Sequence, residues 1–497
     1  MTDSQIQLDV NAHNGSALPV RHVAIRVLND SDNTIYYSYH SVLPPGVTFN
    51  NLGELHGDDV FHDHYRTSMT FTDSSGKRWK RDPAGKLGPL PDKFTLYSGV
   101  DVKKGLDRYR KLFREQFSLE VEVNTSHSGH GLREFFGSKR YEGGKCDAIV
   151  GPHDWLGTFR ARSLLRSIPI PHVVPKDFLT REAFETFRAA EGSVESYGVP
   201  LAYDTAVLFI NRKLYQGEIP KSVPEMFRAG RACRHAGEDD VNIPGVSVSM
   251  GERLHEGDPF MMWPLLASLG GYLFEPQGDD AWLPSANALR APQLAEALIA
   301  LQGIAREYPE SFDPRTTHAT ARQIFSEGST PFHIDTAGAR SEMKCDFEPE
   351  LAPVPIESEI ARPGLSLIYA FYFRDIPSPE NPGNQDFERN EYTRNGEDFL
   401  HYHLGSRIVC SQLSGDLGMP VVSRSGLVDE GAYAAVVQQC CSNSRPMPSL
   451  PNMADVWRIL GELINQCVST SGDSRSVRAA LDVAADNMDG ALGVSKR

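Results

Sequence analysis

One carboxylate of this chain stands where a binding site would need it, between two apolar segments. The segment Ser196–Arg212 reads SYGVPLAYDTAVLFINR and carries Asp204 near its centre. The run Ala206–Ile210 that follows is short and rich in β-branched and aromatic residues, which is typical of a strand buried on both faces. A lone acid just before such a strand is more readily explained by a cleft than by a core. We therefore expect Asp204 to contact a small molecule.

A second segment, Asp258–Phe274 (DPFMMWPLLASLGGYLF), combines an acid with aromatic rings. Asp258 stands beside Phe260 and Trp263 at the start of an expected helix. This combination suits a sugar, because ring faces pack on the C–H face of a pyranose while carboxylate oxygens accept hydrogen bonds from its hydroxyls. The two rings could instead fill the core beside the helix.

Two rival chemistries remain open. In HGDDVFHDH, His62 and His64 would point the same way on a strand and, with His56, could hold a divalent metal; the alternative is a hydrated polar loop. Asp204 with a second aspartate could be the acid–base pair of a glycoside hydrolase, but the sequence does not fix their separation. Nucleophile elbows, P-loops, HExxH and dinucleotide-binding glycine motifs are absent. Catalysis has no positive evidence, and no cofactor is expected.

The elements that must position these residues alternate between strand and helix from residue 93 onward. Strands are expected at Phe94–Tyr97, Leu119–Val123 and Cys146–Val150, with a helix over residues 103–116. This order predicts a mostly parallel sheet, in which ligands bind beyond the carboxyl ends of the strands. Four further candidates lie at such ends: Ser98, Asp101, Asp154 and Trp155.

Later segments predict helices and one exposed insertion. Ser222 opens a capping box with proline in the first turn, and Pro292–Arg306 has a strong apolar stripe. Helices also fit Ala454–Val468 and Ser474–Leu492, whereas Phe373–Arg394 is too polar for a core.

The first part of the chain has a different texture. Val20–Val27 and Thr34–Val42 are partly alternating and are separated by the turn cluster NDSDN. Short strands with frequent turns predict a small antiparallel β-sandwich, followed by a linker rich in glycine and proline. We therefore expect residues 1–92 to form an N-terminal β-sandwich-like domain with its linker.

Composition excludes several classes of protein. At 497 residues the chain is too long for a single core. It has no apolar run of about 18 residues that could span a membrane. A net charge of −15 without a basic stripe argues against nucleic acid as a partner. The amino terminus has no secretory signal, and the 7 cysteines lack a disulfide framework, which together favour the cytosol.

The order of the segments resembles the maltose-binding-protein class of extracellular solute-binding proteins, the substrate-binding components of ABC importers. The resemblance covers about residues 93–492. It rests on PLAYDTAVLFINRKL, on DPFMMWPLLASLGGYLF, on IFSEGSTPFHID at Ile324–Asp335 and on RPMPSLPNMADVW at Arg445–Trp457. It implies an α/β fold of two lobes, the type II periplasmic-binding-protein-like fold, preceded here by the β-sandwich. The bilobal domain would comprise residues 93–497. Lobe 1 would contain about residues 93–205 and part of the 330–420 region. Lobe 2 would contain about residues 210–330 and the C-terminal segments.

The resemblance also implies roles for single residues. Three acids fall on positions where the family has acidic sugar contacts: Asp154, Asp204 and Asp258. Phe260 falls on the aromatic residue that opens a helix of the second lobe, and Trp457 falls on an aromatic platform. Asp335 ends the strand before another ligand loop. The chain departs from the pattern in three places. Gly151 stands where the family has an aromatic residue, and Trp155 stands where it has a basic residue. Thr336-Ala337-Gly338 stands where another aromatic residue is expected. These departures suggest a different, smaller ligand.

We therefore expect a non-enzymatic receptor whose two lobes close over a carbohydrate or similar polyhydroxy solute. An ABC permease or another signalling protein would read the closed form. The resemblance implies an extracytoplasmic location, whereas the signal-free start and the thiols favour the cytosol. The alternative is a cytosolic interaction or scaffold protein that uses a vestigial solute-binding fold.

Overall fold

The computed structural model describes most of the chain. The described residues are 6–28, 34–55, 65–90, 93–98, 114, 120–124, 132–133, 136, 147–169, 178–190, 193, 195–233, 243–251, 256–277, 281–356, 364–373, 414–415, 417, 419–422, 431–442, 444–469 and 474–493. Asp101, the cluster His56, His62 and His64, the helix expected over residues 103–116 and nearly all of the expected insertion lie outside this set.

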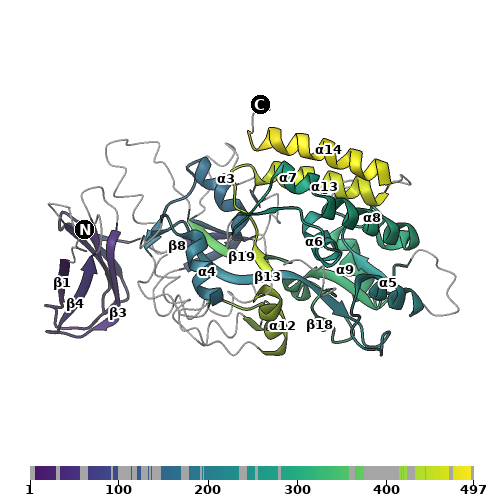
Figure 1. Cartoon of the computed structure of the whole chain (residues 1–497). Coiled ribbons are helices and arrows are strands. Elements are labelled where there is room, and N and C mark those ends of the chain that lie inside the picture. Colours follow the sequence, from purple (N-terminus) through teal and green to yellow (C-terminus); the bar gives the residue numbers. More distant parts are fainter. Residues whose placement is uncertain are drawn as a thin grey trace.

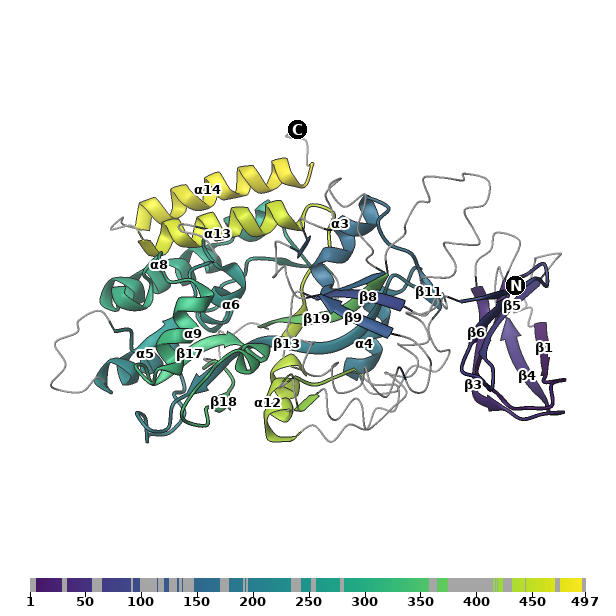
Figure 2. The same ribbon diagram turned by 180° about the vertical axis from the view of Figure 1, so that it is seen from behind.

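The amino-terminal residues form antiparallel sheets, as predicted. One sheet pairs β1 with β4, and the other has the order β3-β2-β5-β6-β7. A small apolar core joins strands of both sheets, with Val10 of β1 packed among Val23, Ile25 and Tyr36. Figures 1 and 2 show this unit at one end of the molecule. The strands are β1 Ile6–His13, β2 Val20–Leu28, β3 Thr34–Leu43, β4 Thr48–Leu55, β5 Arg66–Thr72, β6 Arg78–Arg81 and β7 Leu87–Pro89.

The remaining chain is built on one mixed sheet whose path is β14-β17-β13-β19-β10-β8-β9, with β18 paired to β13 and β20 to β19. Strands β8, β9 and β10 are parallel to one another, as expected, but β13 and β19 run antiparallel to their neighbours along this path, so the predicted mostly parallel sheet is instead mixed. The strands are β8 Lys93–Ser98, β9 Glu120–Asn124, β10 Ala148–Pro152, β13 Gly198–Ile210, β14 Val246–Val248, β17 Phe332–Thr336, β18 Glu350–Ala352, β19 Gly364–Phe373 and β20 Ser444–Pro446. Two short pairs complete the set, β11 Ile168–Pro169 with β12 Glu195–Ser196 and β15 Glu275–Gln277 with β16 Ala281–Leu283.

Strand β13 runs through both halves of this sheet (Figure 1). Its first part, Gly198–Thr205, pairs with β19, and its last part, Ala206–Ile210, pairs with β17 and β18. The alternating side chains of the last part enter different cores. Val207 and Phe209 belong to the first core, which surrounds β8 and β10, whereas Leu208 and Ile210 belong to the second, beside β14 and β17. Strand β13 therefore connects the two lobes without a break.

The helices cover the sheet in two groups. Helices α13 and α14 lie side by side along α7 and α8 over the second core (Figure 1). Helices α3, α4 and α12 carry residues of the first core. The helices are α3 Leu156–Ala161, α4 Phe178–Phe187, α5 Val223–Ala232, α6 Pro259–Ser268, α7 Ala286–Arg290, α8 Pro292–Glu307, α9 His318–Ser326, α12 Gly431–Ser442, α13 Met453–Ser469 and α14 Ser474–Ala491. Short 3-10 turns are η3 His153–Trp155, η4 Pro309–Ser311 and η5 Ala337–Ser341. Within the described residues, no helix combines the length and the apolar character that a membrane crossing needs.

Most predicted elements that fall within the described residues are confirmed, and the start of one strand is corrected. The Ser222 hydroxyl caps α5 by accepting from the Glu225 N–H, and the predicted helix over Pro292–Arg306 matches α8. The strand expected to begin after Asp204 instead includes it, because Asp204 lies inside the uninterrupted β13. The polar residue did not end the strand, because its carboxylate receives hydrogen bonds there. The predicted limits of the domains and lobes stay predictions.

Candidate functional site

Asp204 is held at the junction of the lobes by three backbone N–H groups. Its Oδ1 accepts from Thr205 N at 2.8 Å, from Ala337 N at 2.9 Å and from Gly338 N at 3.4 Å. The side chain is 1% exposed, and Oδ2 has no hydrogen-bond partner within the described part of the chain. Burial raises the pKa of Asp204 to about 7, although the three N–H groups act in the opposite direction. Asp204 thus has one buried carboxylate oxygen whose hydrogen-bonding capacity is unused in the described structure.

Asp154 follows β10 in the turn η3 and is also half satisfied. Its Oδ2 accepts a hydrogen bond of 3.1 Å from the indole Nε1 of Trp457 at the start of α13, while Oδ1 has no partner among the described residues. His153 anchors the turn, since its Nδ1 accepts from Ile368 N at 3.0 Å and its Nε2 therefore donates to the Met447 carbonyl at 2.8 Å. Burial lowers the pKa of His153, which keeps this imidazole neutral.

Asp258 caps helix α6 and pairs with a histidine. Its Oδ1 accepts from Met261 N at 3.0 Å, which satisfies an N–H of the first turn, and its Oδ2 lies 2.9 Å from His318 Nε2. Burial alone would lower the pKa of His318, but the Asp258 carboxylate raises it to about 9. At neutral pH His318 is therefore a cation bound to Asp258.

Asp335 is already satisfied by its own lobe. Arg322 Nε donates to its Oδ2 at 2.7 Å, Thr336 N donates to its Oδ1 at 2.7 Å, and His333 Nε2 lies 3.3 Å from Oδ2. Burial would raise the pKa of Asp335, but His333 and Arg322 hold it well below its usual range. Arg322 also pairs with Glu342. We therefore assign Asp335 a positioning role in place of the predicted ligand contact.

Tyr369, which sequence reasoning missed, connects these groups. It lies on β19 opposite Pro152 of β10 and Ala202 of β13. Burial raises its pKa, and the carboxylates of Asp204 and Asp154 raise it further, while Arg322 opposes them. Asp154 and Asp204 each lie two residues beyond a strand partner of Tyr369, which places one acid on β13 and the other just after β10, the two strands that flank β19. His318 and Arg322 lie one turn apart on α9 and pair with Asp258 and Asp335, so these two acids lie beside the same helix.

Two predicted tryptophan contacts are instead core residues. Trp155 is 3% exposed and packs on Phe159, and its ring fills the space that a Cβ at Gly151 would need. Trp263 is 2% exposed and packs on Phe274 at a ring-centroid distance of 5.0 Å. Burial of Trp155 speaks against a direct contact with solute, whereas Trp263 also lines the pocket described next. Ser98, at the end of β8, is buried as well.

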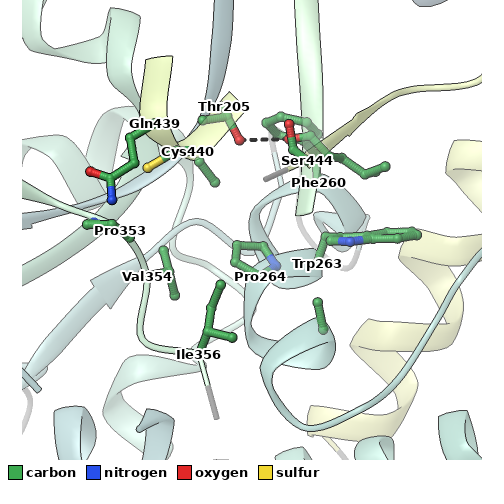
Figure 3. Close-up of a pocket in the computed structure, with 13 residues that line it drawn as sticks. Thr205, Phe260, Trp263, Pro264, Pro353, Val354, Ile356, Gln439, Cys440 and Ser444 are labelled. Carbon is green, nitrogen blue, oxygen red and sulfur yellow. Dashed lines mark hydrogen bonds between the residues drawn. The ribbon is translucent and has the colours of Figure 1, made fainter. Parts of the chain in front are cut away.

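Phe260 is half-buried and lines a pocket to which the four acids do not contribute. Together with Trp263 and Pro264 it lines a largely apolar pocket against β13, β19 and the residues that follow β18 (Figure 3). Thr205 and Leu365 close one wall, where the Thr205 hydroxyl donates to the Leu365 carbonyl at 2.7 Å. None of Asp154, Asp204, Asp258 and Asp335 lines this pocket. Among the described residues, no group of histidine, cysteine and acidic side chains is arranged to hold a metal ion.

The fold and the acidic junction between its lobes define a class: the chain has the type II two-lobe fold of maltose-binding-protein-like solute-binding proteins. No family model matches the sequence. In sequence the chain is similar to the maltooligosaccharide ABC transporter solute-binding lipoprotein of Streptococcus pneumoniae, with 20% identity over 414 residues, 81% of this chain and 90% of that protein. It is also 22% identical over 334 residues to the maltotriose-binding protein of Pyrococcus abyssi, covering 63% of each.

A solved structure supports the same fold. The Thermus thermophilus maltotriose-binding protein bound with maltotriose matches with a TM-score of 0.62 and 16% identity, over 80% of this chain and 100% of that one. The resemblance expected from the segment order is therefore confirmed. The relatives are named as binding proteins and not as enzymes.

Proposed function

We propose that this protein binds a carbohydrate between its lobes, without chemical conversion, as the solute-binding component of an ABC importer. One observation carries the proposal: Asp154 and Asp204 each keep a buried carboxylate oxygen with no hydrogen-bond partner in the described structure. Both carboxylates also raise the pKa of the same residue, Tyr369. Buried acceptors are normally satisfied, so unpartnered ones fit a ligand that donates hydrogen bonds. Sugar hydroxyls are such donors, and the named functions of the relatives support the choice.

The mechanism follows from the uninterrupted strand. Asp204 lies on β13 where pairing with β19 gives way to pairing with β17, so bending of the sheet there would move the lobes around it. A solute that bonds Asp204 and Asp154 on one side and contacts the Trp457 ring and the His318–Asp258 pair on the other would favour the closed arrangement. Exclusion of water would then strengthen each hydrogen bond to a carboxylate. A permease would recognise the closed form.

Calorimetric titration with maltotriose and longer maltooligosaccharides tests this proposal. Asp204→Ala should weaken binding by about 1.5–3 kcal/mol, the range for hydrogen bonds to charged groups, without unfolding the protein. Asp346→Ala is the matched control, because that carboxylate is 81% exposed. Unchanged affinity in Asp204→Ala, or no binding of any oligosaccharide by the parent protein, would refute the proposal. Chromatography of the incubated sugars should show no cleavage products, and their appearance would favour the hydrolase alternative.

A further inference from the structure

The negative charges around Tyr369 are not balanced by the cations described there. Arg322 is paired with Asp335 and Glu342, and His318 is paired with Asp258. Among the described residues, no ion pair reaches Asp154 or Asp204. The polar partners of these two carboxylates are the Trp457 indole N–H and backbone N–H groups, all of them uncharged.

Such an arrangement is costly for an isolated protein. Asp154 is 5% exposed and Asp204 1%, so water reaches neither side chain well. Buried carboxylates are ordinarily paired with a cation, because hydrogen bonds from neutral donors offset only part of the lost hydration. A hydroxyl would satisfy an unpartnered oxygen but would leave the charge in place. A cation would supply both the hydrogen bond and the charge.

We propose that the solute of this site carries a protonated amine as well as hydroxyls, as an amino sugar does, and that the ammonium group binds Asp154 Oδ1 and Asp204 Oδ2. This inference rests on the proposed function, since it names the class of carbohydrate that the same site takes. Neutral sugars remain weaker ligands, because they supply no counter-charge: Asp154 stays without a cation, and Asp204 stays mostly protonated at pH 6. An ammonium group donates up to three hydrogen bonds, so it can serve both oxygens at once.

Proton release provides an independent signature. The groups facing Asp204 are the N–H groups of Thr205, Ala337 and Gly338, the phenol of Tyr369 and the carboxylate of Asp335. Because burial raises the pKa of Asp204 to about 7, the carboxyl group is mostly protonated at pH 6. An arriving ammonium favours the ionised form. Binding at pH 6 should therefore release protons, and the heat of binding should vary with the ionisation enthalpy of the buffer.

The test compares two trimers of identical linkage, the β-1,4 trimer of glucosamine and that of glucose, which differ only in an amine for each 2-hydroxyl. Titration calorimetry at pH 6 should show at least tenfold tighter binding of the glucosamine trimer, with proton release only for that ligand. Asp154→Asn and Asp204→Asn keep the side-chain shape and remove the charge, so each should reduce the preference toward unity. Asp455→Asn on α13 is the control, since that acid is 59% exposed.

The outcomes separate this inference from the proposed function. Equal affinity for the two trimers, or binding of maltotriose alone, overturns the amine and leaves carbohydrate binding intact. No binding of either trimer or of maltotriose overturns both. A preference for the glucosamine trimer that survives both asparagine variants also refutes the assignment to Asp154 and Asp204. Thermal unfolding of each variant confirms that it is folded, and either variant alone suffices for the test.

Discussion

Trp457 donates its indole N–H to Asp154 Oδ2 at 3.1 Å, and this hydrogen bond joins the two lobes across a separation of 303 residues. Trp457 packs against the second core and lies beside Phe274 at a ring-centroid distance of 5.8 Å. Asp154 is carried by the turn that leads into the first core. The contact fixes the orientation of the carboxylate, so that Oδ1 and not Oδ2 remains available to a solute.

Replacement of Trp457 by phenylalanine distinguishes the packing of the aromatic ring from the hydrogen bond that the indole N–H donates. Trp457→Phe keeps an aromatic side chain against Phe274 but leaves Asp154 Oδ2 without its hydrogen bond. Solute affinity should fall about 5- to 30-fold, because an orienting bond to a charged group is lost. Calorimetry measures the affinity, and urea unfolding should show a loss of only about 1–2 kcal/mol. Arg458→Gln on the exposed face should change neither by more than about 0.5 kcal/mol. Undiminished affinity in Trp457→Phe would contradict the orienting role.

A substitution at Gly338 can block access to Asp204 Oδ2 while the aspartate itself is kept. A Cβ at this position would lie 3.1 Å from Asp204 Oδ2 and 3.2 Å from Met419 Sδ. Gly338→Ala should weaken solute binding at least tenfold, because the methyl group crowds the unpartnered oxygen. Stability should fall by only about 1 kcal/mol, since the flexible methionine can move aside. Gly415→Ala is the control, because its Cβ would meet no atom within 4 Å. Equal affinities of the two variants would place the solute away from Asp204 Oδ2.

The ion pair between His318 and Asp258 predicts how stability depends on pH. The pKa of His318 is raised to about 9 in the folded protein from 6.5, so the histidine binds its proton more tightly when folded. The contribution of the His318–Asp258 pair to the free energy of unfolding is therefore complete below about pH 6.5 and is lost as the pH rises through 9. His318→Gln should cost roughly 1–3 kcal/mol at pH 6 and much less at pH 9.5, as measured by urea unfolding. The same loss at both values would show that the pair does not titrate in this way.

Much of this architecture could be predicted from the sequence, because strand periodicity and capping residues act locally. The alternation of strands and helices, the stripe of α8 and the cap of α5 are all local signals. The prediction that β13 begins after Asp204 was wrong, because the N–H groups that satisfy this acid come partly from Ala337 and Gly338, far along the chain. Local sequence does not reveal such a partner.

The site residues also show that local sequence does not predict which distant groups satisfy a polar side chain. Asp335 resembles Asp204 in sequence, yet Arg322 on α9 occupies it, and only the tertiary structure brings these two together. Tyr369 in GLSLIYAFYF cannot be told from Tyr372 by type. In the structure, Tyr372 donates to the Pro152 carbonyl at 2.9 Å, whereas Tyr369 lies among the acids. Trp155 fills the space that Gly151 leaves, which explains why these two departures from the family pattern occur together.

Gly257 sets the position of Asp258 by allowing the loop to touch helix α13. Its φ is +75°, and a Cβ there would overlap the backbone carbonyl of Gly461. Gly257→Ala should therefore destabilise the protein by about 2–4 kcal/mol, because the left-handed backbone is strained and the backbone of α13 must move. Gly303→Ala provides the contrast, since its Cβ meets nothing within 4 Å and alanine favours the helical state of α8 by about 0.5–1 kcal/mol. Urea unfolding of both variants measures the difference. If Gly257→Ala is as stable as the parent protein, the close approach of the loop to α13 does not position Asp258.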